Sequence, residues 1–378
     1  MVSEPMVDIA RKNLLHDRVR FLITVVGVTF SVVLITAQVG IYLGFMRGAS
    51  IIIDNTAADI WITSANSANF DFPLGFSEAK LNKVKEAPGV ASADLLILGW
   101  VGMRLKNGGA ESIELIGFNP DTGVGGPWHL VEGSIQALKA GPGIIVDESA
   151  FSRLGHLRVG DLVEIVETRV RVVGISRGVR GLTTAPYVFT SYRTAQQIIP
   201  WLRDQTVFIV ARVAPGYDPE EVAARLRQIR DVDVHTRRQY SLKTRLYWTI
   251  ETGLGFGFAL TVLMGVIVGS MIVGQTIYTS TIEHLREYGT LKAIGATNRE
   301  IYAIVLRQAL IHAAIGYVLG LAITLVVSRP IGAAGLVMVV PPWLMIAVLV
   351  VTVAMCLGAS LLSVRRAVRV DPMLVFRA

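Results

Sequence analysis

The chain has 378 residues, of which 52% are hydrophobic and 17% are charged, and its mean hydropathy is +0.53. About a quarter of the residues of a soluble protein are charged, so this composition indicates a membrane protein with a sizeable extramembrane part. It excludes a disordered or low-complexity chain, and the single cysteine excludes a small disulfide-stabilised domain. The net charge of +7 could indicate nucleic-acid binding, so its distribution along the chain decides that question.

Four long stretches of the sequence contain no charged residue. They are residues 21–46, 252–282, 308–328 and 330–364. A helix rises about 1.5 Å per residue, so about 20 apolar residues cross a hydrocarbon core about 30 Å thick. The first stretch is too long for the apolar core of a cleaved signal peptide, and an uncleaved anchor is the better interpretation. We therefore expect transmembrane helices at residues 21–46, 252–281, 307–328 and 343–363, the last of which follows Pro341-Pro342.

Basic residues around these stretches predict the orientation of the chain. The first 20 residues, the connection 282–307 and the tail 364–378 together hold 12 basic residues, whereas the loop 329–342 holds only Arg329. The positive-inside rule places both termini and the 282–306 connection in the cytoplasm, and the 47–245 segment outside. The apolar spacing of the 1–20 arm is typical of an amphipathic helix at the membrane surface.

The same distribution explains the net charge. The 47–245 segment holds 23 basic and 21 acidic residues, whereas the three cytoplasmic pieces hold 12 basic and 7 acidic residues. The positive excess is therefore a topology signal and an attraction to anionic lipid headgroups. No basic stripe interleaved with aromatic residues is present, so nucleic acid is excluded as a partner.

The 47–245 segment is long enough to bury its own core and shows two β-α-β patterns. In chain order we expect a strand at 59–62, a helix at 77–86 with Ser77 as its N-cap, a strand at 90–105, a strand at 207–213, a helix at 219–229 and a strand at 232–235. Two such halves would pair into a ferredoxin-like α+β sandwich. Alternating residues at 160–166 and 169–175 predict a mainly-β module, inserted at about 107–205 between the halves.

No group of residues in this outer domain is typical of catalysis. His129, His156 and His235 share no metal-ligand spacing, and no nucleophile or redox motif is present. Asp147 and Glu148 are adjacent, and adjacent residues of a strand face opposite ways, so a solvated turn is favoured over an acid/base pair. We expect no catalytic residue, no metal site and no enzyme activity in this chain.

The connection between the second and third expected helices has the strongest pattern in the chain. Leu285, Tyr288, Leu291 and Ile301 could line one apolar stripe, with charged residues on the other side. One interpretation is a solvated amphipathic connector on the inner leaflet. The other is a short helix that docks into a groove of a cytoplasmic motor. The segment reads Arg286-Glu287-Tyr288-Gly289-Thr290-Leu291-Lys292-Ala293-Ile294-Gly295-Ala296.

This segment resembles the signature of ABC transporter permeases of the MacB/FtsX/LolC superfamily. The tail is similar to the C-terminal end of these permeases at Arg365-Arg366-Ala367, Asp371-Pro372 and Phe376-Arg377. One helix, a large outer domain and three more helices are also their layout. Within the superfamily the chain is most similar to DevC-type permeases, through residues 13–20, 117–120 and Tyr247-Trp248.

The resemblance implies the MacB-type (type VII) permease fold and a mechanism by mechanotransmission. Two copies of the chain would bind two ATPase subunits, and nucleotide-driven closure would pass through the first two helices to the outer domain. By analogy the connection is the coupling segment. Its expected ATPase-coupling residues are Arg286, Glu287, Tyr288, Gly289, Leu291, Lys292, Ile294, Gly295 and Ala296.

The same resemblance implies the remaining partners. The chain has no phosphate-binding loop of the form Gly-x-x-x-x-Gly-Lys-Ser/Thr, so ATP and Mg²⁺ would be bound by a separate ATPase subunit, and no cofactor is expected here. DevC-type permeases work with a periplasmic membrane-fusion adaptor and an outer-membrane channel. This implies a multi-pass protein of a Gram-negative inner membrane that exports or extracts lipids, glycolipids or other small amphiphiles.

Glycines and a few polar residues inside the spans suggest helix packing. Four Gly-x-x-x-Gly pairs could serve packing within the chain or a dimer seam: Gly40 and Gly44, Gly253 and Gly257, Gly265 and Gly269, and Gly316 and Gly320. His312, Gln38 and Gln275 are polar groups at membrane depth, for which an interhelical hydrogen bond is expected, and Cys356 is expected to fill apolar space. The spans contain no acidic residue, which argues against a proton-coupled transporter.

Two other functions stay open at this point. One is an FtsX-like transducer, in which ATPase cycling activates a periplasmic cell-wall hydrolase. The other is a membrane-anchored adhesion or sensor protein without an ATPase. An outer domain of about 200 residues with an inserted module suits an adaptor-coupled exporter better than a small hydrolase-binding lobe.

Overall fold

Four helices of the structure, a computed structural model, are long and apolar enough to cross a membrane. The structure describes residues 18–105, 108–181, 185–293, 295–333 and 337–367, so residues 1–17 of the expected 1–20 helix and most of the tail lie outside the described residues. Residues 18–20 belong to the first long helix. The chain forms two compact units: residues 1–44 with 254–378, and residues 45–253.

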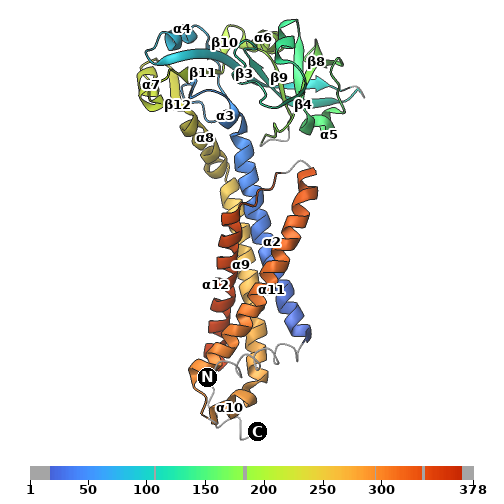
Figure 1. Cartoon of the computed structure of the whole chain (residues 1–378), viewed down its shortest axis with the longest axis vertical. Coiled ribbons are helices and arrows are strands. Elements are labelled where there is room, and N and C mark those ends of the chain that lie inside the picture. The colour runs from blue at the N-terminus through green and yellow to red at the C-terminus, as the bar shows by residue number, and fades with distance from the viewer. Residues whose placement is uncertain (1–17, 106–107, 182–184, 294, 334–336, 368–378) are drawn as a thin grey trace. The chain divides into compact units, whose positions relative to one another are not determined.

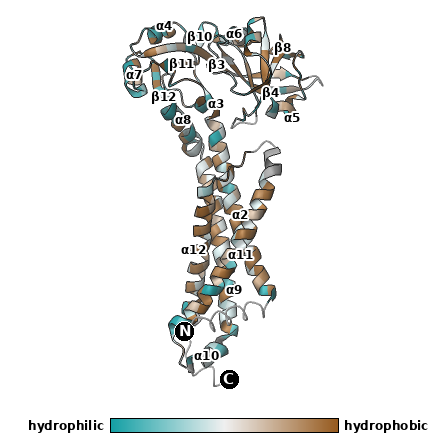
Figure 2. Cartoon of the chain, viewed as in Figure 1, coloured by the Kyte–Doolittle hydropathy of each residue, from teal (hydrophilic) through white to brown (hydrophobic). Residues whose placement is uncertain are grey.

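Within the described residues, the helical unit consists of these four long helices and one short helix (Figures 1 and 2). They are α2 (Arg18–Ala49, which passes into the other unit), α9 (Leu254–Glu283), α10 (Leu285–Ala293), α11 (Asn298–Ala333) and α12 (Pro342–Ala367). Three of the expected transmembrane segments lie wholly in these helices, and the second, expected at 252–281, begins two residues later at Leu254. Helix α11 begins at Asn298, nine residues before the expected span, because Glu300 accepts a hydrogen bond from the Thr297 backbone N–H (2.7 Å) and caps the helix there.

One buried cluster joins the four long helices. Val32 of α2, Val273 of α9, Ala309 of α11 and Cys356 of α12 all belong to it. Cys356 therefore fills apolar space, as expected. The outer faces of the same helices expose large apolar side chains, such as Phe256, Met271, Val318 and Ile346. Such faces are unfavourable in water and suit hydrocarbon, which fits the assignment as spans.

The 45–253 unit is built on a mixed sheet with the strand order β12-β1-β11-β3-β4-β9-β6-β8-β5. Its first four strands in this order are β12 (Val232–Thr236), β1 (Ile60–Ser64), β11 (Phe208–Val213) and β3 (Val90–Arg104). They pair antiparallel, and α4 (Lys80–Lys85) and α7 (Pro219–Leu226) cover one of their faces. This order of two β-α-β halves confirms the predicted ferredoxin-like sandwich.

The first predicted helix of this unit was placed wrongly at its start. Residues Phe76–Ser77 form the short strand β2, which pairs with β10 (Gln205–Thr206), and the helix begins only at Lys80. Ser77 is therefore not the N-cap, although its hydroxyl oxygen accepts a hydrogen bond from the Ala79 N–H (3.3 Å). A strand pairing with residues more than 100 positions away overrides the local capping pattern.

The inserted module is mainly β, as predicted. Its strands are β4 (Ala110–Phe118), β5 (Leu130–Gly133), β6 (Gly143–Asp147), β7 (Leu162–Ile165), β8 (Thr168–Ser176) and β9 (Tyr187–Ser191). It also contains α5 (Phe151–Leu154), α6 (Tyr192–Ile198) and the short 3-10 turns η1 (Ile135–Lys139), η2 (Glu148–Ala150) and η3 (Pro200–Leu202). Strand β3 pairs with β11 through Val90–Leu96 and with β4 through Ile97–Arg104, so one strand belongs to both parts.

Candidate functional site

Helix α10 carries most of the residues that the sequence predicts to contact an ATPase. Glu287 is exposed and its carboxylate lies 3.1 Å from Nδ1 of His284. A Cβ atom at Gly289 would have no neighbour within 4 Å outside its own helix backbone, so this position faces open space. Lys292 is half-buried, and Ala296 is half-buried beyond the helix end.

Two other predicted contacts have structural roles. Tyr288 is only 6% exposed, so it anchors α10 and is not an open contact. Gly295 has φ +106° and donates its N–H to the carbonyl of Lys292 (3.0 Å), which ends α10 in the left-handed conformation that favours glycine. The side chains of Arg286 and Leu291, and all of Ile294, lie outside the described residues.

A bidentate ion pair connects the start of α2 with the end of α9, directly before α10. The Arg20 guanidinium donates from Nη2 to Oε1 of Glu283 (3.0 Å) and from Nη1 to Oε2. The fork of an arginine matches a carboxylate in this geometry and fixes the relative position of both groups. The sequence assigned Arg20 only to topology, because nothing local indicates a partner 263 positions away.

Six of the eight predicted glycines pack against other parts of the same chain. A Cβ at Gly316 or Gly320 of α11 would collide with Val28 or Val32 of α2, and one at Gly269 of α9 would collide with Ser31. The remaining close approaches are Gly265 to Leu34 and Ile35 of α2, Gly40 to Met338, and Gly44 to the Val337 carbonyl. The four glycines of α9 and α11 let helices of one copy approach closely, whereas Gly40 and Gly44 make room for the segment that precedes α12.

The other predicted pair differs. Gly257 has open space around its Cβ position, and Gly253 has φ +72° just before α9 begins. Gly253 therefore breaks the helix and does not pack against another one. The His312 prediction is wrong in its partner: its Nδ1 lies 2.8 Å from the carbonyl of Gln308 in the same helix, and its ring packs on Phe21 of α2.

In the 45–253 unit, the chain that continues from α2 contacts the chain that leads into α9. Arg245, at the end of α8 (Arg237–Leu246), donates to the Ser50 hydroxyl (2.8 Å) and to the carboxylate of Asp54 (2.7 Å) in α3 (Ile51–Asn55). Thr249 lies 3.2 Å from the sulfur of Met46. We call the residues of this region the stalk junction: Phe45, Met46, Ser50, Asp54, Asp71, Arg245, Trp248 and Thr249.

A π-helical turn, η4 (Tyr247–Glu251), separates α8 from α9 within the stalk junction. Helix α8 was not predicted from the sequence, although Thr236 and Gln239 form a capping box that could have indicated its start. Single π-helical turns are frequent at functional sites. With the left-handed Gly253 after it, this turn makes α8 and α9 two separate helices.

Asp71 is a fully buried carboxylate that holds this turn. Its Oδ2 accepts hydrogen bonds from Nε1 of Trp248 (2.7 Å) and from Nδ2 of Asn69 (3.4 Å), and its backbone carbonyl accepts from Nε1 of Trp100 (3.1 Å). Burial raises the pKa of the Asp71 carboxyl from 3.8 to about 6, although the Trp248 hydrogen bond acts in the opposite direction. Among the described residues its Oδ1 has no hydrogen-bond partner.

The described part of the outer unit contains no group of residues that could hold a metal ion. His235 stacks on Tyr240 (5.6 Å between ring centroids), and burial lowers the pKa of His235 to about 4. Asp147 is buried and not in a solvated turn, which corrects the prediction for Asp147-Glu148. It caps η2 through the Ser149 N–H (3.0 Å) and accepts from the Ser176 hydroxyl (3.0 Å), while exposed Glu148 pairs with Arg177.

Comparisons with known proteins cover nearly the whole chain. Residues 21–229 match the family model of the MacB-like periplasmic core domain, and residues 240–372 match the FtsX-like permease C-terminal model. An uncharacterized ABC transporter permease of Mycobacterium tuberculosis H37Rv is 27% identical over 380 residues, which cover 98% of this chain and 99% of that protein.

A second relative and a solved structure are also similar to parts of this chain. An uncharacterized ABC transporter permease of Mycobacterium bovis is 26% identical over 351 residues, 93% of each chain. The periplasmic region of MacB from Actinobacillus actinomycetemcomitans aligns with a TM-score of 0.39 and 12% identity, over 53% of this chain and 98% of that one.

Proposed function

Because the chain belongs to the MacB/FtsX family of ABC transporter permeases, we propose that it is the membrane subunit of an ATP-driven exporter that works by mechanotransmission. In this proposal two copies of the chain bind two copies of a separate ATPase subunit, which holds ATP and Mg²⁺. Helix α10 and both termini lie in the cytoplasm, and the 45–253 unit is periplasmic. The complex exports lipids, glycolipids or other small amphiphiles with a membrane-fusion adaptor and an outer-membrane channel.

The observation that carries this proposal is that the chain of α2 and the chain of α9 are joined at two places, one in each unit. Next to α10, Arg20 and Glu283 join the two helices. In the outer unit, Arg245 joins the chain before α9 to Ser50 and Asp54, which follow α2. In this proposal a displacement of α10 by an ATPase moves α2 and α9 together, and the continuous helix α2 includes Phe45 and Met46 of the stalk junction, where the Asp71–Trp248 hydrogen bond holds the π-helical turn.

Blocking the exposed face of α10 tests the coupling assignment. Gly289 faces open space in this chain, so Gly289→Trp should leave the permease folded. If α10 docks into a groove of the ATPase, the indole should fill that groove and remove most of the copurifying ATPase. The measurement is the molar ratio of ATPase to permease after affinity purification from the membrane.

Gly289→Ala is the matched control for this substitution. Alanine favours the helix more than glycine does and adds only a methyl group, so copurification should stay at the wild-type level. Equal ATPase recovery with Gly289→Trp and Gly289→Ala would show that this face of α10 does not meet the ATPase and would contradict the coupling assignment.

A further inference from the structure

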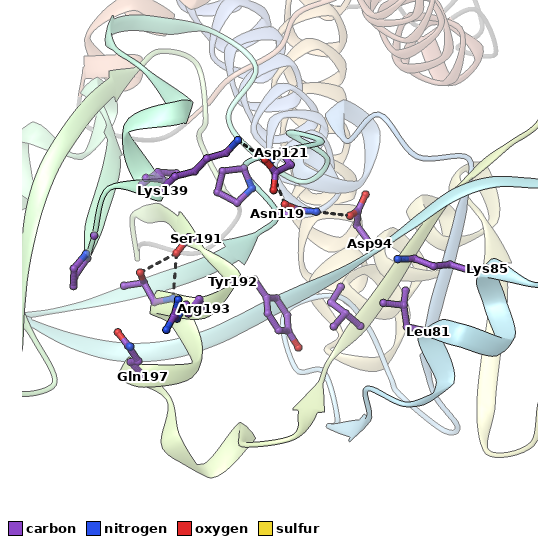
Figure 3. A pocket seen from close by; sticks show the side chains of 16 residues that line it. Leu81, Lys85, Asp94, Asn119, Asp121, Lys139, Ser191, Tyr192, Arg193 and Gln197 are labelled. Carbon is purple, nitrogen blue, oxygen red and sulfur yellow. Dashed lines mark hydrogen bonds and ion pairs between the residues drawn. The ribbon is translucent and has the colours of Figure 1, made fainter.

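A cavity of about 610 Å³ lies where the two parts of the outer unit meet (Figure 3). Helix α4 and strand β3 of the ferredoxin-like part supply Leu81, Lys85 and Asp94, and the inserted module supplies Asn119 and the first turn of α6. Small-molecule sites in proteins usually measure about 300–1,000 Å³. Neither part forms the cavity alone, and no step of the proposed ATPase coupling uses it.

A buried carboxylate in the cavity wall has free capacity to accept hydrogen bonds. Asp94 is 7% exposed, and its Oδ1 accepts a hydrogen bond from Nδ2 of Asn119 (2.9 Å). No donor of the described residues reaches its Oδ2. A buried carboxylate with a single neutral donor is poorly compensated for its lost hydration, so a cationic donor from a ligand would be favourable at this position.

Two cations of the lining lack an opposite charge. Lys85 of α4 and Arg193 of α6 line the cavity, and neither forms an ion pair within the part of the chain that the structure describes. The third cation of the lining, Lys139, pairs with Asp121, as Figure 3 shows. Lys85 and Arg193 are therefore available to an anionic group, and an arginine suits a carboxylate or a phosphate.

Apolar groups complete the lining. Leu81, Leu95 and Leu138 face the cavity, as does Tyr192. The Tyr192 hydroxyl donates to the carboxylate of Glu78 (2.7 Å), which holds the ring in place and leaves its apolar face for contact. A ligand of this cavity therefore needs an apolar body in addition to its charged groups.

We propose that this cavity binds a small zwitterionic amphiphile. Its ammonium group contacts Asp94, its carboxylate or phosphate contacts Arg193 of α6, and its apolar body packs on the leucines and Tyr192. A short peptide with an apolar side chain and an ethanolamine lysophospholipid, whose acyl chain is the apolar body, both have this chemistry. Binding needs no ATPase, so the site can fail while the proposed function stands, and the reverse is also true.

Equilibrium dialysis of the purified full chain in a neutral detergent tests the site, with empty micelles as the blank. The probe is radiolabelled phenylalanyl-alanine, which carries both charges. N-acetyl-phenylalanyl-alanine lacks the ammonium and phenylalanyl-alanine amide lacks the carboxylate. Each should bind about tenfold more weakly, since each loses a charge-assisted hydrogen bond. Competition by hexanoyl lysophosphatidylethanolamine, whose acyl chain supplies the apolar body, would identify a lipid as the source, and lack of competition would identify a peptide.

Substitutions place the two charges on the protein. Asp94→Asn should weaken the binding of phenylalanyl-alanine about tenfold and leave the binding of its N-acetyl form unchanged. Arg193→Gln should weaken the binding of phenylalanyl-alanine about tenfold and leave the binding of its amide unchanged. Lys83 of α4 and Glu86, which follows α4, lie outside the cavity lining. Lys83→Gln and Glu86→Gln should therefore leave the binding of both dipeptides unchanged. Equal binding of capped and uncapped dipeptides to the wild type, or no binding of either zwitterion at millimolar concentration, overturns the proposal even if Asp94→Asn does not fold.

Discussion

Arg20→Glu should lower the ATP turnover of the assembled transporter several-fold, and Arg20→Glu combined with Glu283→Arg should restore most of it. The single change replaces a bidentate ion pair by two carboxylates at the point where α2 meets the end of α9. Repulsion would then separate the two helices next to α10. The double change restores opposite charges in the same place. Recovery of ATP turnover would not be expected if Arg20→Glu had only damaged the fold.

The measurement is the ATPase rate of the purified permease–ATPase complex in lipid vesicles. Arg18→Glu is the matched control, because it changes the net charge equally on the same exposed turn of α2 and no ion pair of Arg18 occurs among the described residues. Both single variants should still bind the ATPase, since α10 is unchanged. If Arg20→Glu turned over ATP as fast as Arg18→Glu, the ion pair would have no part in coupling.

Asp71→Asn should stabilise the outer unit at neutral pH and remove much of its pH dependence between pH 4 and 6. Burial raises the folded-state pKa of Asp71 to about 6, against 3.8 for the ordinary group. The folded state therefore binds a proton that the unfolded state has released, so stability rises as pH falls from about 6 to about 4. At neutral pH the buried charge destabilises the fold by up to about 3 kcal/mol.

The asparagine side chain keeps an oxygen acceptor for the indole N–H of Trp248 and has no charge to bury. The measurement is the midpoint of thermal unfolding of the full chain, monitored by tryptophan fluorescence at each pH from 4 to 8. The exposed-site variant Glu132→Gln is the control. Glu114 is also buried, so only the difference between wild type and Asp71→Asn isolates Asp71. Parallel pH profiles of the two proteins would show that Asp71 is not the responsible group.

The functional meaning of Asp71 follows from its place in the chain. A buried carboxylate that destabilises the fold at neutral pH indicates a functional role for its position. Asp71 holds the indole of Trp248 in the π-helical turn before α9. Phe45 of α2 and Phe72 pack on the same indole (6.2 Å between centroids in each case). The Asp71–Trp248 hydrogen bond and these two ring contacts therefore hold the π-helical turn within the 45–253 unit.

The sequence was sufficient for features that depend on neighbouring residues. Apolar length alone indicates a span, so the four helices were found with errors only at their ends, such as the early start of α11 at Asn298. The alternation of β1, β3, β11 and β12 and the two intervening helices likewise predicted the ferredoxin-like order. Where a distant partner competed with a local pattern, as for Ser77, the local pattern failed.

Burial and pairing depend on the whole fold, and only the tertiary structure decided them. It buried Asp147 and Tyr288, gave six glycines to packing within one copy and made Gly253 a helix break. It also brought together Arg20 with Glu283 and Asp71 with Trp248, pairs separated by 263 and 177 positions. Periodicity reports which face of an element is apolar, whereas the partner of a charged or polar group is set by chain segments that meet only after folding.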